Sequence, residues 1–168
     1  CFATLALVAD RTSKINIGTG VAISGTRPAP VNAAGIATIN ALAPGRTFFG
    51  VGAGNTARRV MGLAPQRIAE FETYLQTLAP LLRGEEAIYH HDGQAIPIRL
   101  YVSGFGPKSL ALAGQYGHGA VMGAASSAAV TASWHSLNEG ASRANRTLAP
   151  GGDYYTTALT TMVVLEQG

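Results

Sequence analysis

The hydrophobic and polar positions of the chain repeat with two different periods, and each change of period marks the border of an element. Short runs that are apolar at consecutive or alternate positions predict strands, whereas apolar residues every third or fourth position predict helices. Strands are expected at 15–24, 47–52, 98–104, 119–123 and 154–166. Helices are expected at 3–9, 27–42, 66–84, 107–117 and 127–145.

The segment 66–84 has the clearest helical pattern, because its apolar residues form one stripe and Gly84 follows the last of them. In the segment 27–42, Pro28 and Pro30 suit a first helical turn. The segment 87–97 separates a helix from a strand and is expected to be an excursion of the chain, that is, a connecting loop.

The regular alternation of strand and helix predicts an α/β fold with a parallel sheet and right-handed crossovers. The strands are short and apolar on both faces, as buried parallel strands are. A doubly wound sheet and a (β/α)₈ barrel both fit this pattern. Residues 1–168 contain no sign of a second domain and are expected to form one.

Composition narrows the classes of partner. Hydrophobic residues make up 47% of the 168 residues, which is typical of a globular protein, while charged residues make up only 12%. So few charges indicate a surface that is partly buried, either against a dimer partner, in which case a homodimer is expected, or against missing parts of the same fold. The net charge of +3 comes from Lys and Arg residues that are scattered along the chain, so nucleic acid is not expected as a partner. A phosphorylated or carboxylated small molecule is the expected partner instead.

The chain has a single cysteine, Cys1, and no apolar run long enough to span a membrane. No signal-peptide pattern occurs, so a cytoplasmic location is expected. The sequence begins inside an apolar run and ends just after a strand-like one, so we expect it to be a fragment of a longer chain.

Glycine-rich loops follow three of the first four predicted strands, and the stretch TFFGVGAGN at 47–55 is the richest of them. Glycine lets backbone N–H groups approach a ligand, and ligands bind at the carboxyl ends of parallel strands. A methyltransferase that uses S-adenosylmethionine could also use this loop, but it needs an acidic residue about 20 residues further on at the end of a strand. Glu70 and Glu72 lie on a predicted helix instead.

The stretch GFGPKS at 104–109 precedes a helix and forms a second candidate site, this one for a phosphate. Ser103, the amides of Gly104 to Gly106 and Lys108 are its candidate ligands. The four histidines have no metal-binding spacing and are interpreted as surface residues, so no metal is expected. No nucleophile elbow or close carboxylate pair occurs, so no catalytic residue is assigned.

Residues 17–55 and 97–123 resemble, in the same order, the luciferase-like superfamily of flavin and deazaflavin enzymes. The strongest likeness is to methylenetetrahydromethanopterin reductase and other oxidoreductases that use coenzyme F420. The likeness includes the turn at Arg27, the APGR turn at 43–46, GVGAGN at 50–55 and the GPK stretch at 106–108. Where relatives tend to have Asp-Gly, this chain has His118–Gly119, which leaves the local packing there to be explained.

The resemblance implies a TIM barrel, usually dimeric, of which this chain would hold about five β/α units and would lack the N-terminal strands and the last strand. It implies a cis peptide bond at Gly20–Val21, in a bulge behind the ring of the cofactor. By the same likeness, Gly52, Gly54 and Asn55 would lie near the ring or its side chain. Ser103, Gly104, Phe105 and Gly106 would hold the phosphate-bearing tail.

The activity implied is hydride transfer between coenzyme F420 and a small organic substrate. An FMN-dependent monooxygenase, a methyltransferase and a flavin-binding remnant without catalysis are the alternatives. The acid and base residues of such enzymes are expected on strands that this chain lacks. Gly54→Val is expected to weaken cofactor binding with little effect on folding, provided that the loop is exposed.

Overall fold

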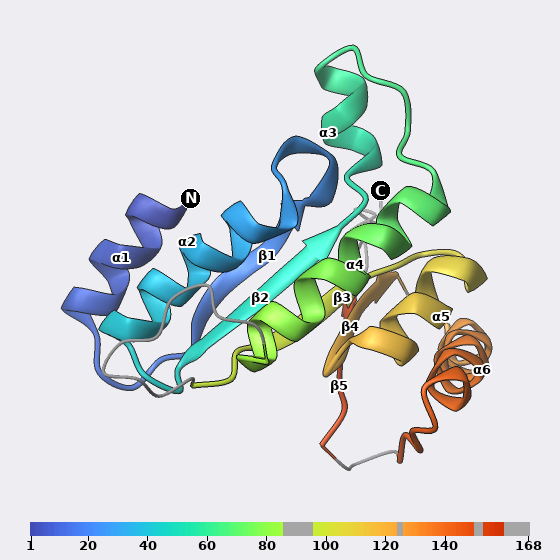
Figure 1. Ribbon diagram of the computed structural model, residues 1–168. Helices are drawn as coiled ribbons and strands as arrows, with labels where there is room; N and C mark the ends of the chain where they lie inside the picture. Colours follow the sequence, from blue (N-terminus) through green and yellow to red (C-terminus); the bar gives the residue numbers. More distant parts are fainter. Residues whose placement is uncertain (86–95, 124–125, 150–152, 160–168) are drawn as a thin grey trace, which may run out of the picture.

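The computed structural model describes residues 1–85, 96–123, 126–149 and 153–159. These residues contain a parallel sheet of five strands in the order β1-β2-β3-β4-β5, which is the order of the chain (Figure 1). The strands are β1 (Ile17–Ile23), β2 (Thr47–Gly52), β3 (Arg99–Ser103), β4 (Gly119–Gly123) and β5 (Tyr155–Leu159). A doubly wound sheet reverses its strand order, so the unbroken order favours the barrel.

The larger helices cover one face of the sheet, and one short helix lies beyond the carboxyl end of β2 (Figure 1). The helices are α1 (Phe2–Arg11), η1 (Ser24–Thr26), α2 (Ala29–Leu42), α3 (Asn55–Val60), α4 (Ile68–Arg83), α5 (Pro107–Tyr116) and α6 (Ser127–Arg143). The predicted strands and long helices are confirmed, although β5 is described only to Leu159 and most of the excursion at 87–97 lies outside the described residues. None of the described helices is long and apolar enough to cross a membrane.

The core lies between the sheet and the helices because alternate strand residues point toward the helical layer. Phe49 and Val51 of β2 and Val102 of β3 are fully buried there. The stripe expected on α4 is confirmed, since Phe71 and Leu75 are also fully buried. Gly84 then ends the helix in the left-handed conformation, with a φ of 74°.

Arg46, in the turn before β2, holds two earlier segments of the chain together. Its guanidinium donates hydrogen bonds to the carbonyl oxygens of Ile15 (2.9 Å), Thr12 (2.8 Å) and Ala9 (3.3 Å). Two of these carbonyls lie at or next to the carboxyl end of α1, where backbone oxygens lack helical partners and a cation is favourable. Arg46 therefore joins α1 to the segment that enters β1.

Glycine allows α5 and α6 to pack backbone against backbone. A Cβ at Gly140 of α6 would meet the backbone carbonyl of Ala111 on α5. In the reverse direction, a Cβ at Gly114 of α5 would meet the carbonyl of Leu137 on α6. The two helices therefore meet through reciprocal glycine contacts that leave no room for a methyl group.

His118 has a structural role that the sequence did not reveal, so its interpretation as a surface residue is wrong. It is half-buried, and its Nδ1 accepts a hydrogen bond from the Leu100 N–H at 3.1 Å. The backbone N–H of His118 donates a hydrogen bond to the Leu100 carbonyl at 2.7 Å. His118 thus satisfies both backbone groups of Leu100 in the neighbouring strand and takes the place expected for an aspartate.

Acidification is expected to destabilise the protein through His118. Burial, aided by the positive charge of Arg146, lowers the pKa of His118 below its ordinary value. Its neutral form contributes stability that is fully present above about pH 6.5, the unfolded pKa, and is lost as the pH falls through the folded pKa. Protonated Nδ1 could not accept from the Leu100 N–H.

The measurement is urea denaturation at pH 7.5 and pH 5, compared with His118→Asn. The asparagine keeps an acceptor oxygen but does not titrate, so this variant should lose less stability between the two pH values than the wild-type protein. Equal losses in the two proteins would show that His118 does not carry the effect.

Candidate functional site

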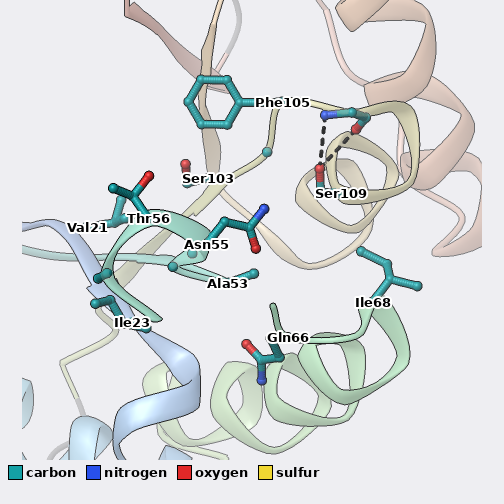
Figure 2. Close-up of a pocket in the computed structure, with 15 residues that line it drawn as sticks. Val21, Ile23, Ala53, Asn55, Thr56, Gln66, Ile68, Ser103, Phe105 and Ser109 are labelled. Atoms are coloured by element: carbon teal, nitrogen blue, oxygen red, sulfur yellow. Dashed lines mark hydrogen bonds between the residues drawn. The ribbon is translucent and has the colours of Figure 1, made fainter. Parts of the chain in front are cut away.

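A cavity of about 620 Å³ lies at the carboxyl ends of β1, β2 and β3 (Figure 2). It is bounded by the ends of these strands, the α3 segment, the first residue of α4 and the first turn of α5. The lining residues are Val21, Ile23, Gly52, Ala53, Gly54, Asn55, Thr56, Ala57, Gln66, Ile68, Ser103, Gly104, Phe105, Gly106 and Ser109. This is the end of a parallel sheet at which ligands bind in barrels.

The structure gathers almost all of the residues proposed from the sequence around this cavity. Val21, Gly52, Gly54, Asn55 and the segment 103–106 line it, whereas Gly20 lies beside it in β1 and does not. Their roles in cofactor binding stay predictions. Lys108 is exposed and is not part of the lining.

The pairing between β1 and β2 is interrupted beside the cavity. Thr19 pairs with Phe49 and Ala22 with Val51, so the two residues Gly20 and Val21 lie opposite Gly50 alone. The Gly20–Val21 peptide bond is cis, as expected from the resemblance. The resulting bulge places Val21 in the cavity wall.

The glycines at 50, 52 and 54 also have a structural role, which lies in the packing of β1 against them. A Cβ at Gly50 would meet the Thr19 carbonyl, one at Gly52 would lie 3.2 Å from Val21 Cγ2, and one at Gly54 would meet the Ile23 side chain. Three residues of β1, each two apart, therefore occupy the room left by three glycines in and just after β2, also two apart. All three glycines accommodate the neighbouring strand, and Gly52 and Gly54 also line the cavity.

Comparison with known proteins agrees with this geometry. Residues 1–167 match the family model described as luciferase-like monooxygenase. The chain belongs to the luciferase-like monooxygenase family. Across the described residues, its parallel sheet and flanking helices are those of the family's TIM-barrel structures.

Relatives within the family include enzymes named for coenzyme F420. The chain is 31% identical over 164 residues to the F420-dependent glucose-6-phosphate dehydrogenase of Beutenbergia cavernae, covering 86% of this chain and 49% of that protein. It is 29% identical over 135 residues to the 5,10-methylenetetrahydromethanopterin reductase of Methanolobus tindarius, covering 73% and 41%. The chain thus spans about half the length of these relatives.

A solved structure in the family has the same arrangement. The coenzyme F420-dependent tetrahydromethanopterin reductase of Methanopyrus kandleri superposes with a TM-score of 0.74 at 25% identity. The match covers 95% of this chain and 53% of that one. The five β/α units described here therefore correspond to part of a luciferase-like barrel.

The first turn of α5 forms the polar end of the cavity. The Ser109 hydroxyl donates to the Gly106 carbonyl at 3.0 Å and accepts from the Gly106 N–H at 3.3 Å, which fixes the loop that enters the helix (Figure 2). The N–H groups of a first helical turn lack intrahelical acceptors and carry partial positive charge. This end of the cavity suits an anion, although none of its lining side chains is charged.

Sequence reasoning missed the side of the cavity formed by Gln66 and Ile68. The Ser24 hydroxyl lies 2.5 Å from Gln66 Oε1 and 3.2 Å from the Gly52 carbonyl, so η1 fixes the Gln66 amide next to β2. The α3 helix that precedes this segment was also missed, because its six residues contain no apolar periodicity and Val60 is exposed. Gln66 was predicted to be the first residue of the helix at 66–84, whereas α4 begins at Ile68 and leaves Gln66 in the preceding segment.

The described residues contain no group of three or more His, Cys, Asp or Glu side chains that could hold a metal ion. His90 and His91 lie outside those residues, and His135 is exposed on α6. No acidic or basic side chain among the lining residues offers itself as a proton donor. The polar groups that the lining residues offer to a ligand are therefore backbone groups, hydroxyls and amides.

Gly54→Val is expected to weaken cofactor binding and also to destabilise the fold. Gly54 has a φ of 72°, and a Cβ there would meet the Ile23 side chain. The left-handed conformation alone costs a residue with a Cβ about 1–2 kcal/mol. The expectation of little effect on folding applied to an exposed loop, whereas Gly54 is half-buried.

Gly62→Val is the matched control, because Gly62 has nearly the same φ, 71°, and a Cβ added there would have no other atom within 4 Å. Urea denaturation of both variants separates the cost of the conformation from that of the clash. Equal destabilisation of the two variants would contradict a contact between position 54 and Ile23.

Proposed function

We propose that this protein is an oxidoreductase that transfers hydride between coenzyme F420 and a small organic substrate. The observation that carries the proposal is the cavity at the carboxyl ends of β1–β3, which combines an apolar wall with the amino end of α5. The names of the Beutenbergia cavernae relative and of the Methanopyrus kandleri structure support F420 as the cofactor. The chain spans about half of those relatives, so the activity is proposed for the whole protein to which these residues correspond.

The residues of the cavity fit such a cofactor. Val21, Ile23 and Ile68 provide apolar surface for a flat ring. The first turn of α5 and Ser103 would hold the phosphate of its side chain by N–H and O–H groups. A cavity of about 620 Å³ lies within the range of small-molecule sites, which is about 300–1,000 Å³.

The deazaflavin, when bound, supplies the hydride chemistry. The protein's part is to hold the ring and to keep water away from it. Val21 would support one face of the ring, and the amides of Asn55 and Gln66 would hydrogen-bond polar groups of the cofactor or substrate. The group that moves a proton to or from the substrate has no candidate among the lining residues.

An FMN-dependent monooxygenase is the second candidate, and the description of the family supports it. The two cofactors share a tricyclic ring and a phosphate-bearing side chain, so the same cavity surfaces would serve both. The unbroken strand order and the family match disfavour a methyltransferase with an open, doubly wound sheet.

The test is a fluorescence titration of the purified chain with coenzyme F420, followed by competition with FMN. Saturable F420 binding that excess FMN does not displace supports the deazaflavin oxidoreductase. Displacement by FMN would support the monooxygenase instead. A chain that binds neither cofactor, while remaining folded by circular dichroism, would contradict a complete cofactor site within these residues.

A further inference from the structure

The bulge in β1 changes the spacing of the ladder beside Gly50. The register of β1 and β2 shifts between Thr19 and Ala22, so Gly20 and Val21 together lie opposite Gly50. A bulge disrupts the ladder locally and bends the strand that carries it. Gly50 is buried, so its backbone N–H and carbonyl depend on partners within the protein.

The Thr19 hydroxyl bonds to both of these groups. Its Oγ1 donates to the Gly50 carbonyl at 2.6 Å and accepts from the Gly50 N–H at 3.0 Å. Thr19 is itself 6% exposed, so water does not compete for these bonds. The hydroxyl thus holds β1 to Gly50 directly beside the two bulge residues.

Val21 connects this arrangement to the cavity through close steric contacts. A Cβ at Gly50 would meet the Thr19 carbonyl and would lie 3.2 Å from Val21 Cγ1, so Val21 lies close above Gly50. Val21 also lies close to Gly52, and both Val21 and Gly52 line the cavity. The position of this wall therefore depends on how β1 is held against Gly50.

We propose that Thr19 is a positioning residue, whose hydroxyl holds Val21 in place as a wall of the cavity without touching a ligand. The proposal concerns the shape of the cavity in the free protein. Its consequence for cofactor affinity rests on the function proposed above.

The variants are Thr19→Val, which keeps the shape of the side chain but removes both hydrogen bonds, and Thr19→Ser, which keeps the hydroxyl. Thr47→Val is the matched control, because Thr47 is also buried in this sheet and its hydroxyl bonds to Asn40 Oδ1, away from the cavity. Thr47→Val should lower stability without affecting Val21 or Gly50.

The first readout needs no cofactor. Amide hydrogen exchange at Gly50 should be at least about tenfold faster in Thr19→Val than in the wild-type protein, and the methyl resonances of Val21 should shift. Thr19→Ser and Thr47→Val should leave both signals near their wild-type values. Unchanged exchange at Gly50 and unshifted Val21 resonances in Thr19→Val would overturn the proposal, whether or not F420 binds.

The second readout is the dissociation constant for F420. We expect Thr19→Val to weaken binding by about tenfold, with Thr19→Ser and Thr47→Val within about twofold of the wild-type value. Equal weakening by Thr19→Val and Thr47→Val would overturn the positioning role, because it would indicate a general loss of stability. If the wild-type chain binds no cofactor, the proposed function fails, and the Gly50 and Val21 signals still decide the role of Thr19.

Discussion

Gly140→Ala is expected to lower the free energy of unfolding by about 3 kcal/mol, which is the upper end of what overpacking by one small group costs. The methyl group would meet the backbone carbonyl of Ala111, and backbone cannot turn aside as a side chain can. α5 and α6 would have to separate, which would open the packing around Leu137, a fully buried residue of α6.

The expected effect has the opposite sign to the one that helix propensity predicts. On an exposed helical surface, alanine in place of glycine stabilises a helix by about 1 kcal/mol. Urea denaturation should therefore show destabilisation at Gly140, where helix propensity alone predicts stabilisation. Thr131→Ala on the exposed side of α6 is the control and should change stability by less than about 0.5 kcal/mol. A more stable Gly140→Ala protein would refute the close packing of α5 on α6.

Gly52→Val is expected to weaken F420 binding by about 100-fold, the largest effect on affinity. A Cβ at position 52 would lie 3.1 Å from Ser103 Cβ and 3.2 Å from Val21 Cγ2. The two methyl groups of a valine would therefore have to displace these side chains or enter the cavity. Losses of this size are near the upper end of what one misfitting group causes in a binding pocket, which is about 10–200-fold.

The variant Gly52→Ala provides an intermediate step and should weaken binding by about tenfold. Val60→Ala is the control, because Val60 is 84% exposed on α3 and does not line the cavity. Fluorescence titration measures the affinities, and circular dichroism checks that each variant is folded. Wild-type affinity in Gly52→Val would remove the end of β2 from the site.

The alternating periods predicted the strands and the long helices because each of these elements requires a characteristic spacing of apolar residues. The strand order followed in turn, since consecutive β/α units place each strand beside the last. The position of the cavity was predictable for the same reason: loops that follow parallel strands gather at one edge.

Other features depend on contacts between residues far apart in the sequence, and the pattern does not encode them. The Thr19 hydroxyl bonds to Gly50, 31 residues away, and Ser24 reaches Gln66, 42 residues away. His118 gave no signal because its role depends on the backbone of Leu100 in another strand. The glycines at 50, 52 and 54 were visible, but their use became clear only when β1 lay beside them.

The fit of β1 side chains against β2 glycines means that neither strand can change alone, so the two are expected to be mutationally coupled. An alanine at position 52 should cost less stability when Val21 is also alanine, because the contact with Val21 Cγ2 is then lost and the contact with Ser103 Cβ stays. The double variant would change the shape of the cavity wall with a smaller loss of stability than Gly52→Ala alone causes. Altered ligand preference in this protein should therefore be sought through paired substitutions across β1 and β2.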